Sequence, residues 1–280
     1  MKIQRIAAFS HDGKGGNPAG VVLLDATVAG AEMARVAADV GYSETAFAVA
    51  LDASRKNWQV RYFSPESEVP FCGHATIALG AVLGQTFGPG TYALTLNTGS
   101  ITVETDKSGD EMTATLLSPP THSEGVTPDA LHDALTLFQL TPDDLDPRLP
   151  PARIHGGADH LVLPLRSRAR LAAMAYDLDH GRMVMRKHGL VTVMLVFVEA
   201  DQTFVARNAF ASGGVFEDPA TGAAAAAFAG YLRDQGWPHG GSLTIRQGED
   251  MGSPSLISVS LDTVKGAPVR VSGTARRIDP

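Results

Sequence analysis

Residues 72–83 read CGHATIALGAVL, and residues 221–232 read TGAAAAAFAGYL. Both stretches consist almost entirely of small and aliphatic residues, and a glycine-containing turn leads into each. A helix without a polar face and with little bulk fits where packed strands surround it on all sides. The two stretches therefore predict two buried helices, one beginning near His74 and one near Thr221, each in the core of its own domain.

The sequence around these helices is typical of short strands. Alternating or β-branched residues between turn signals predict a strand-rich first half, and the second half repeats that style. Two further helices are predicted, Val28–Val40 ending at Gly41, and Pro128–Leu140 with Thr127 as N-cap. The expected strands are Lys2–Phe9, Val21–Leu24, Ala46–Leu51, Trp58–Phe63, Tyr92–Leu96, Ile101–Glu104, Met112–Leu117, His160–Leu165, Val191–Glu199, Phe204–Phe210 and Val269–Thr274. This mixture predicts an α+β protein.

The length of 280 residues favours two domains, at about 150 residues for each. The proline-rich stretch Ser118–Asp129 is the best candidate linker, so we expect domains at 1–120 and 121–280. An alternative assignment packs the final strand back on the N-terminal domain. No exact repeat joins the two halves, so a duplication rests on the two small-residue helices alone.

Composition excludes several classes of protein. Hydrophobic residues make up 44% of the chain and charged residues 19%, which is ordinary globular usage. The formal net charge of −7, without a block of Lys or Arg, argues against nucleic-acid binding and against a basic membrane patch. The single cysteine, Cys72, rules out an internal disulfide and any metal site with two thiolates. With no signal-peptide pattern and no long apolar stretch, we expect a soluble, cytoplasmic protein.

The candidate chemistry lies at the starts of the two core helices. A helix N-terminus presents backbone N–H groups and partial positive charge, which suits a carboxylate or phosphate. His74 and Asp218 lie at these starts, and both are acid/base candidates. Glu44, between a helix end and an apolar strand, is the third, because burial there would favour proton uptake by its carboxylate.

Each of these residues also has a structural interpretation. Glu44 could be solvated or cap a helix, His74 could be a hydrogen-bonded turn residue, and Asp218 could N-cap the helix that follows. Cys72 is interpreted as a small buried hydrophobe rather than a nucleophile. The glycines at 13–16 match neither a dinucleotide fingerprint nor a phosphate-binding loop, and the nine histidines form no ligand pattern, so no metal or cofactor is predicted.

Four motifs, in order along the whole chain, resemble the phenazine biosynthesis-like (PhzF-like) family. They are GNPAGVV at 16–22, SETAF at 43–47, RYFSPESEVPFCGHAT at 61–76 and EDPATG at 217–222. The resemblance implies the diaminopimelate-epimerase fold, with two pseudo-symmetric domains, each a β-barrel-like sheet around a central helix, and the active site between them. It also implies a homodimer and a cofactor-independent isomerase of a dihydro-hydroxyanthranilate.

The resemblance also implies roles for particular residues. Glu44 would move a proton between two carbons, with His74 and Asp218 in the same active site. Gly73 and Gly222 would offer backbone N–H groups to a substrate carboxylate. The motif positions add three expected substrate contacts: Asn17, Thr221 and Ala223.

One position departs from the family pattern. The last motif usually continues with serine, and here residue 223 is alanine, which removes a hydroxyl worth roughly 0.5–1.5 kcal/mol to a bound polar substrate. The first half of the site, Cys72 to His74, also resembles proline racemases and hydroxyproline epimerases. Those enzymes need a second cysteine near residue 218, and the chain has none.

The sequence therefore predicts a PhzF-like isomerase of a small amino or cyclic carboxylate, with Glu44 as general base and then general acid. The alternative is a non-catalytic protein that binds a metabolite or a partner on the same scaffold. A nicotinamide oxidoreductase is a third interpretation, but the chain lacks the glycine fingerprint that such an enzyme needs.

Overall fold

The computed structural model describes residues 1–108 and 111–278. The chain forms two units: residues 1–117 together with the segment from Ser272 make the first, and Ser118–Val271 make the second. Each unit contains one of the two small-residue helices, α2 (Gly73–Phe87) and α6 (Gly222–Asp234). These are the helices that the sequence predicts to be buried.

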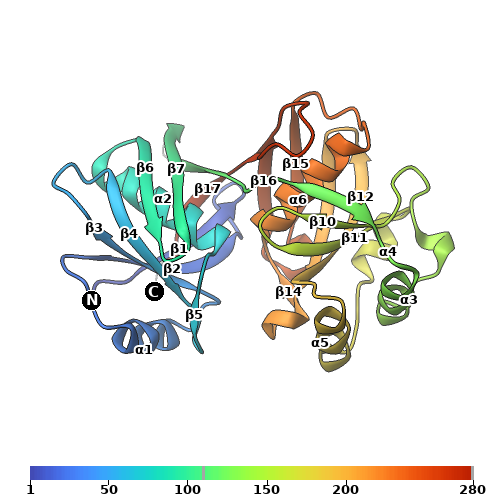
Figure 1. Ribbon diagram of the computed structural model, residues 1–280, viewed down its shortest axis with the longest axis horizontal. Helices are drawn as coiled ribbons and strands as arrows, with labels where there is room; N and C mark the ends of the chain where they lie inside the picture. Colours follow the sequence, from blue (N-terminus) through green and yellow to red (C-terminus); the bar gives the residue numbers. More distant parts are fainter. Residues whose placement is uncertain (109–110, 279–280) are drawn as a thin grey trace. The chain divides into compact units, whose positions relative to one another are not determined.

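The first unit is a closed ring of strands around α2 (Figure 1). Its strands pair in the order β17, β1, β2, β3, β4, β6, β7 and β8, and β8 pairs again with β17. Every residue of α2 from His74 to Gly84 is buried, as an apolar helix inside such a ring must be. The strands are β1 (Gln4–Ser10), β2 (Asn17–Leu24), β3 (Thr45–Ala50), β4 (Asn57–Phe63), β5 (Glu68–Val69), β6 (Gly90–Leu96), β7 (Gly99–Ser108), β8 (Glu111–Leu117) and β17 (Arg270–Arg277).

Helix α1 (Gly30–Val40) packs beside this ring and sets the path of the chain into β3. Its buried face, which includes Met33 and Val36, contacts Val22, Phe47 and other apolar side chains of the sheet. The helix ends at Gly41, whose left-handed backbone with φ of 72° requires a residue without a Cβ penalty. This end is the one that the sequence predicts.

The second unit wraps a sheet around α6, and seven of its eight strands form one continuous order. They pair in the order β9, β10, β11, β12, β13, β15 and β16, and α6 contacts strands from both ends of that order. The strands are β9 (His122–Gly125), β10 (Ala152–His155), β11 (Asp159–Leu165), β12 (Thr192–Ala200), β13 (Thr203–Ala209), β14 (Glu217–Asp218), β15 (Ser242–Gln247) and β16 (Ser255–Ser260). Three helices pack outside: α3 (Pro128–Leu137), α4 (Arg168–Ala172) and α5 (Leu178–Lys187).

The two units repeat one topology. In both, a parallel pair (β2–β3, β11–β12) is followed by an antiparallel strand, the core helix and a parallel return strand (β6, β15). Ala46 pairs with Tyr62 as Met194 pairs with Asn208. Tyr62 also pairs with Val69, and Asn208 pairs with Asp218. Counting two residues back from Ala46 and Met194 makes Glu44 equivalent to Thr192. Counting three residues on from Val69 and Asp218 makes Cys72 equivalent to Thr221, and the next two pairs are Gly73 with Gly222 and His74 with Ala223.

The fold class expected from the resemblance is confirmed: each unit is an α+β barrel-like sheet around a central helix. Thr127 is the predicted N-cap of α3, and its side chain accepts a hydrogen bond from the Ala130 backbone N–H. The chain passes from the first unit to the second between Leu117 and Ser118, at the start of the predicted linker Ser118–Asp129. The linker stretch itself belongs to the second unit and contains β9, which pairs with β10. Proline at 119, 120 and 128 borders this short strand without interrupting it.

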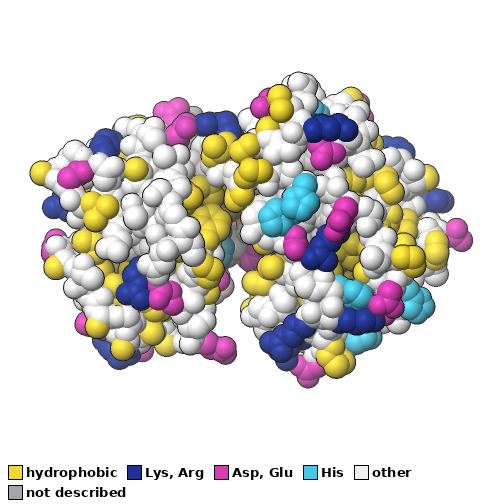
Figure 2. All heavy atoms as spheres, in the orientation of Figure 1, with side chains coloured by type: hydrophobic (Ala, Val, Ile, Leu, Met, Phe, Trp, Pro, Cys, Tyr) yellow, Lys and Arg dark blue, Asp and Glu magenta, His cyan; other side chains and the backbone are white. Residues whose placement is uncertain are grey.

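The distribution of charge on the surface and the character of the helices agree with what the composition predicts. On the face drawn in Figure 2, Lys and Arg side chains are interspersed with Asp and Glu rather than gathered in one basic patch. Within residues 1–108 and 111–278, no helix has the length and apolar character needed to cross a membrane.

Candidate active site

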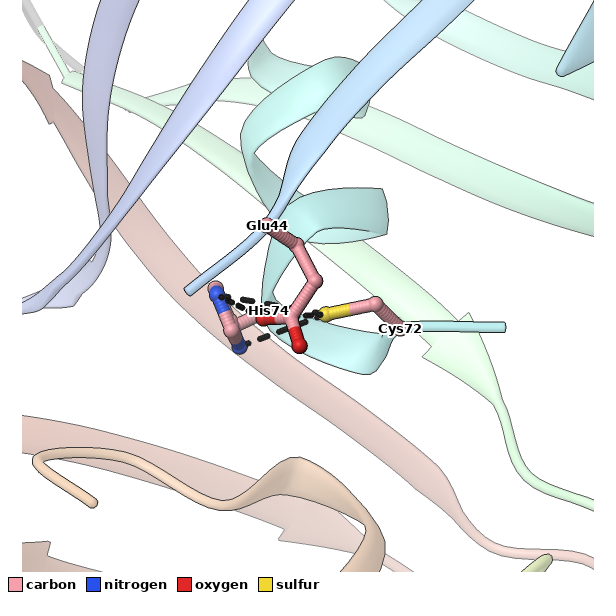
Figure 3. A group of neighbouring side chains, drawn as sticks. All are labelled: Glu44, Cys72 and His74. Atoms are coloured by element: carbon pink, nitrogen blue, oxygen red, sulfur yellow. Dashed lines mark hydrogen bonds and ion pairs between the residues drawn. The ribbon is translucent and has the colours of Figure 1, made fainter. Parts of the chain in front are cut away.

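Glu44, Cys72 and His74 form a cluster at the N-terminus of α2 (Figure 3). The two helix residues come from the quoted core stretch, where Cys72 is the N-cap residue and His74 is the second residue of the helix. Cys72 is 9% exposed and His74 8% exposed, and the Glu44 side chain is 16% exposed. The cluster is therefore largely shielded from water.

Glu44 is brought to the cluster by the turn between α1 and β3. After Gly41 ends α1, the chain passes Tyr42 and Ser43 and enters β3 at Thr45. The Gly20 backbone N–H donates to the Glu44 backbone oxygen at 3.1 Å, which fixes this point against β2. A Cβ at Gly20 would lie 2.5 Å from the Thr45 hydroxyl oxygen, so glycine is what allows β2 and β3 to approach here.

The three side chains meet at one oxygen of Glu44. Its Oε2 accepts from the Cys72 thiol at 3.4 Å and lies 3.3 Å from His74 Nε2. Cys72 Sγ also lies 3.4 Å from His74 Nδ1, and the Ser43 hydroxyl lies 3.3 Å from His74 Nε2. Among the described residues, the other oxygen, Glu44 Oε1, accepts no hydrogen bond. One carboxylate oxygen is thus held in place while the other is left for a further partner.

Asp218 lies in the second unit, in the short strand β14 that precedes α6. It is 9% exposed, and its carboxylate Oδ2 accepts from the Thr221 hydroxyl at 2.5 Å. Thr221, not Asp218, is the N-cap residue of α6, and its side chain makes no cap hydrogen bond. The N-cap interpretation of Asp218 is therefore wrong, and its carboxylate is instead held beside the helix start.

A chain of buried polar side chains leads away from Asp218. Gln247 Oε1 accepts from the Thr221 backbone N–H at 3.3 Å, and Gln247 Nε2 donates to the Asp218 backbone oxygen at 2.7 Å. Gln247 Oε1 also accepts from Asn208 Nδ2 at 3.1 Å. Beyond Asn208 the chain continues through β12 into β11. We call the following five residues the polar relay: His160, Thr192, Asn208, Gln247 and Thr221. The first four of them are at most 1% exposed.

The remaining residues of the predicted site lie at the start of β2 and at the starts of the two core helices. Asn17 is the first residue of β2 and is 2% exposed. Gly73 and Gly222 are the first residues of α2 and α6, and Ala223 is the second residue of α6. A Cβ added at Gly73 would meet no atom within 4 Å, so the space beside this helix start is open within its unit.

Among residues 1–108 and 111–278, three groups of side chains have the composition of metal ligands. Glu44, Cys72 and His74 form the first, and the others are His122 with His155 and Asp159, and Asp129 with Asp133 and His188. Sequence inspection found no such grouping, because each one joins different elements. In the third group, Lys187 donates to Asp133 at 2.7 Å, so a cation already neutralises that carboxylate.

Sequence reasoning missed two parts of this arrangement. Cys72 is not merely a small hydrophobe, since its thiol contacts both Glu44 and His74. The polar relay was missed because its members come from four strands and a helix start that are far apart in the sequence. The signal in the sequence was a polar residue on a strand face that is otherwise apolar, as with Gln247 after Leu243 and Ile245.

Comparison with known proteins shows which family the chain resembles. The model of the family described as phenazine biosynthesis-like protein matches residues 6–278. An uncharacterized isomerase of Escherichia coli (strain K12) is 30% identical over 98% of this chain and 95% of that protein. An uncharacterized isomerase of Deinococcus radiodurans is 34% identical over 96% of this chain and 90% of that protein.

Solved structures share the fold. A Bacillus anthracis phenazine biosynthesis protein of the PhzF family superposes with a TM-score of 0.87 at 20% identity, covering 100% of this chain and 98% of that one. A predicted epimerase of Pseudomonas aeruginosa gives a TM-score of 0.82 at 25% identity, with coverage of 99% and 96%. A probable proline racemase of Agrobacterium radiobacter gives 0.66 at 13% identity, with coverage of 99% and 90%, which extends the likeness of fold to that group.

Proposed function

This chain belongs to the phenazine biosynthesis-like protein family and is an isomerase, and we propose that Glu44 carries the proton that its reaction moves. In this proposal the substrate is a small carboxylate of the amino-acid or cyclic amino-acid type. Glu44 first removes a proton from one carbon as general base. It then returns the proton to another carbon of the same substrate as general acid.

The observation that carries the proposal is the unequal environment of the two Glu44 oxygens. Oε2 faces the Cys72 thiol and His74 Nε2, whereas Oε1 accepts no hydrogen bond from the described residues. A carboxylate held through one oxygen keeps its orientation while the other oxygen takes up and releases a proton. Such positioning shortens the approach to a reacting carbon and lowers the entropic cost of the step.

The other site residues serve binding and orientation in this proposal. His74 and Cys72 orient Glu44. Asp218 orients the substrate through an amino or hydroxyl group, because a carboxylate accepts hydrogen bonds from such donors. Gly73 and Gly222 offer backbone N–H groups at the starts of α2 and α6 to the substrate carboxylate, and the positive helix ends stabilise the delocalised negative charge of the carbanion.

Three positions bear on which carboxylate is bound. Asn17 and Thr221 are proposed substrate contacts with polar side chains. Ala223 offers only a methyl group where the family pattern usually has a serine hydroxyl. We therefore expect a substrate that forms no hydrogen bond with residue 223. The dihydro-hydroxyanthranilate that the resemblance implies is accordingly one compound to test and not the assigned substrate.

Solvent deuterium incorporation tests the role of Glu44. The protein is incubated in D₂O with a panel of small amino and cyclic carboxylates, and substrate carbons are followed by NMR together with product formation. Glu44→Gln is expected to slow isomerisation by roughly 10²–10⁴-fold, because glutamine cannot take up the proton. Glu66→Gln, at an exposed position in the same unit, is the matched control and should retain wild-type activity.

Full activity of Glu44→Gln on a verified substrate would refute the assignment. Tight ligand binding, with neither exchange nor product, would instead favour the second candidate, a binding protein on the same scaffold. The proposed homodimer is tested separately by light scattering at the exit of a sizing column. A mass equal to one chain would contradict it.

A further inference from the structure

The relay that leads away from Asp218 has a direction, and two backbone groups set it. The Thr221 backbone N–H can only donate, and it faces Gln247 Oε1 at 3.3 Å. The Asp218 backbone oxygen can only accept, and it faces Gln247 Nε2 at 2.7 Å. Turning the Gln247 amide around would set N–H against N–H and oxygen against oxygen. The orientation of Gln247 is therefore fixed.

Because the orientation of the Gln247 amide is fixed, the direction of each hydrogen bond from His160 to Gln247 is fixed as well. Since Gln247 Oε1 is an acceptor, Asn208 presents its Nδ2 donor to it at 3.1 Å. Asn208 Oδ1 must then accept from the Thr192 hydroxyl at 3.0 Å. With its proton used in that bond, the Thr192 oxygen accepts from His160 Nδ1 at 2.8 Å. His160 therefore carries its proton on Nδ1.

The links after Gln247 continue in the same direction. Gln247 Nε2 donates its second proton to the Thr221 hydroxyl oxygen at 3.1 Å. The Thr221 hydroxyl in turn donates to Asp218 Oδ2 at 2.5 Å. Each residue from His160 onward thus donates toward the next, and the last acceptor is a carboxylate. Aligned hydrogen bonds polarise one another, and a donated bond favours the charged form of a carboxylate.

The surroundings of His160, where the relay starts, agree with this direction of the hydrogen bonds. His160 Nε2 is buried and has no hydrogen-bond partner among the described residues. A proton there would be an unsatisfied buried donor on a charged ring, which is costly in a low-dielectric interior. In agreement, burial lowers the pKa of His160 from 6.5 to about 4.

We propose that His160, Thr192, Asn208 and Gln247 are positioning residues that hold Asp218 as an oriented, ionised acceptor for the substrate. The inference rests on the proposed role of Asp218 in binding, and it adds residues of four strands, β11, β12, β13 and β15, to the functional machinery. It also gives a structural reason for the substrate group proposed above: a fixed, ionised Asp218 requires a hydrogen-bond donor, such as an ammonium or a hydroxyl, to face it. A substrate that presents only hydrogen-bond acceptors to Asp218 would be repelled by its carboxylate.

The equivalence of the two units supports this assignment. Thr192 occupies the position that corresponds to Glu44, and Thr221 the position that corresponds to Cys72. In the first unit these positions carry a titratable carboxylate and a thiol in direct contact. In the second unit they carry two hydroxyl groups joined through neutral amides. The same framework thus places a proton carrier in one unit and a fixed acceptor in the other.

Thr192→Val and Thr192→Ser form the matched pair of variants that tests the relay. Valine keeps the shape and removes the hydroxyl, whereas serine keeps the hydroxyl. Thr121→Val is the control, because Thr121 is 1% exposed, lies in the same unit and bonds Arg233 rather than the relay. Thermal unfolding of each variant establishes that it is folded before the other measurements are read.

Two NMR measurements need no substrate. Imidazole ¹⁵N shifts report the His160 tautomer, and the carboxyl ¹³C resonance of Asp218 against pH reports its ionisation. We expect the Nδ1–H tautomer in the wild type, and an upward shift of the Asp218 titration midpoint in Thr192→Val but not in Thr192→Ser or Thr121→Val. An Nε2–H tautomer in the wild type, or an unmoved midpoint in Thr192→Val, would overturn the relay.

Activity on a substrate identified by deuterium incorporation then tests the positioning role. Thr192→Val should raise KM several-fold with a smaller change in kcat, and Thr192→Ser should restore the wild-type KM. If Thr192→Val leaves KM unchanged while the NMR results hold, the relay exists and its role in binding is refuted. A failure of Glu44→Gln to slow the reaction would refute the proposed function alone, because the two NMR measurements do not involve Glu44.

Discussion

At the scale of the residue, His160 shows how burial decides the chemistry of a side chain. It is 1% exposed and gains one hydrogen bond, from Nδ1 to Thr192, while Nε2 has no partner among the described residues. A histidine exposed to water would bind a proton near pH 6.5, whereas burial lowers the pKa of this one to about 4. It is therefore neutral at physiological pH and cannot serve as an acid there.

This shift makes the stability of the protein depend on pH. Between pH 4 and 6.5 the unfolded chain binds a proton at residue 160 and the folded chain does not. The contribution to the free energy of unfolding is thus fully present above about pH 6.5 and falls, by on the order of 3 kcal/mol in total, as the pH drops toward 4. Chemical denaturation from pH 4 to 7.5 measures it.

His160→Asn is the informative variant, because asparagine offers a donor near the Nδ1 position and does not titrate. Its free energy of unfolding should vary less between pH 4 and 6.5 than that of the wild type. His122→Asn, at an exposed position, is the control and should keep the wild-type pH dependence. An identical dependence in wild type and His160→Asn would contradict the assignment of this loss to His160.

At the scale of the element, helix α2 shows why its sequence is so restricted. A Cβ at Gly80 would lie 2.6 Å from Val103 Cγ2 and 3.1 Å from the Ala114 Cβ, on β7 and β8. A Cβ at Gly84 would lie 2.8 Å from Met112 Sδ. The closed ring of strands thus leaves room at these points for a helix backbone and nothing more. The small residues follow from the radius of the ring.

Gly80→Ala is therefore expected to destabilise the protein although alanine favours helix. The added methyl group must displace Val103 or the helix itself, at a cost of about 1–3 kcal/mol. Denaturant unfolding gives the change, and Gly125→Ala is the control, because a Cβ there meets no atom within 4 Å. A stabilising effect of Gly80→Ala would show that the ring is looser than the structure has it.

At the scale of the whole molecule, the chain closes the first ring with its own C-terminal strand. β17 pairs with β1, where Ala275 lies opposite Ala8, and on its other side with β8. More than 150 residues separate β8 from β17 in the sequence. Closure leaves this sheet without exposed edges, which is how barrels avoid edge-to-edge association.

Deleting residues 270–280 tests the importance of this closure. We expect faster amide hydrogen exchange in β1 and β8, because the deletion leaves their facing backbone groups without partners. The amides of β12 and β13, which lie in the second unit, serve as the internal control and should keep their protection. Unchanged exchange in β1 and β8 would mean that β17 contributes little to the ring.

The sequence by itself determined the features that depend on neighbouring residues. The run of small residues predicted both core helices, Gly41 predicted the end of α1, and Thr127 predicted the start of α3. Such signals are local, because a cap or a turn needs only a few adjacent residues. The four motifs likewise identified the family, and they named Glu44, His74 and Asp218 as the residues to examine.

Only the tertiary structure decided which side chains act together. Thr192, Asn208 and Gln247 come from β12, β13 and β15, and 39 residues separate the last two. Strand register sets such contacts, and a shift of one residue would turn each side chain to the opposite face of the sheet. The thiol of Cys72 meets Glu44 for the same reason, across 28 residues of sequence. Residue identity supplies the donors and acceptors, and the register of the strands selects their partners.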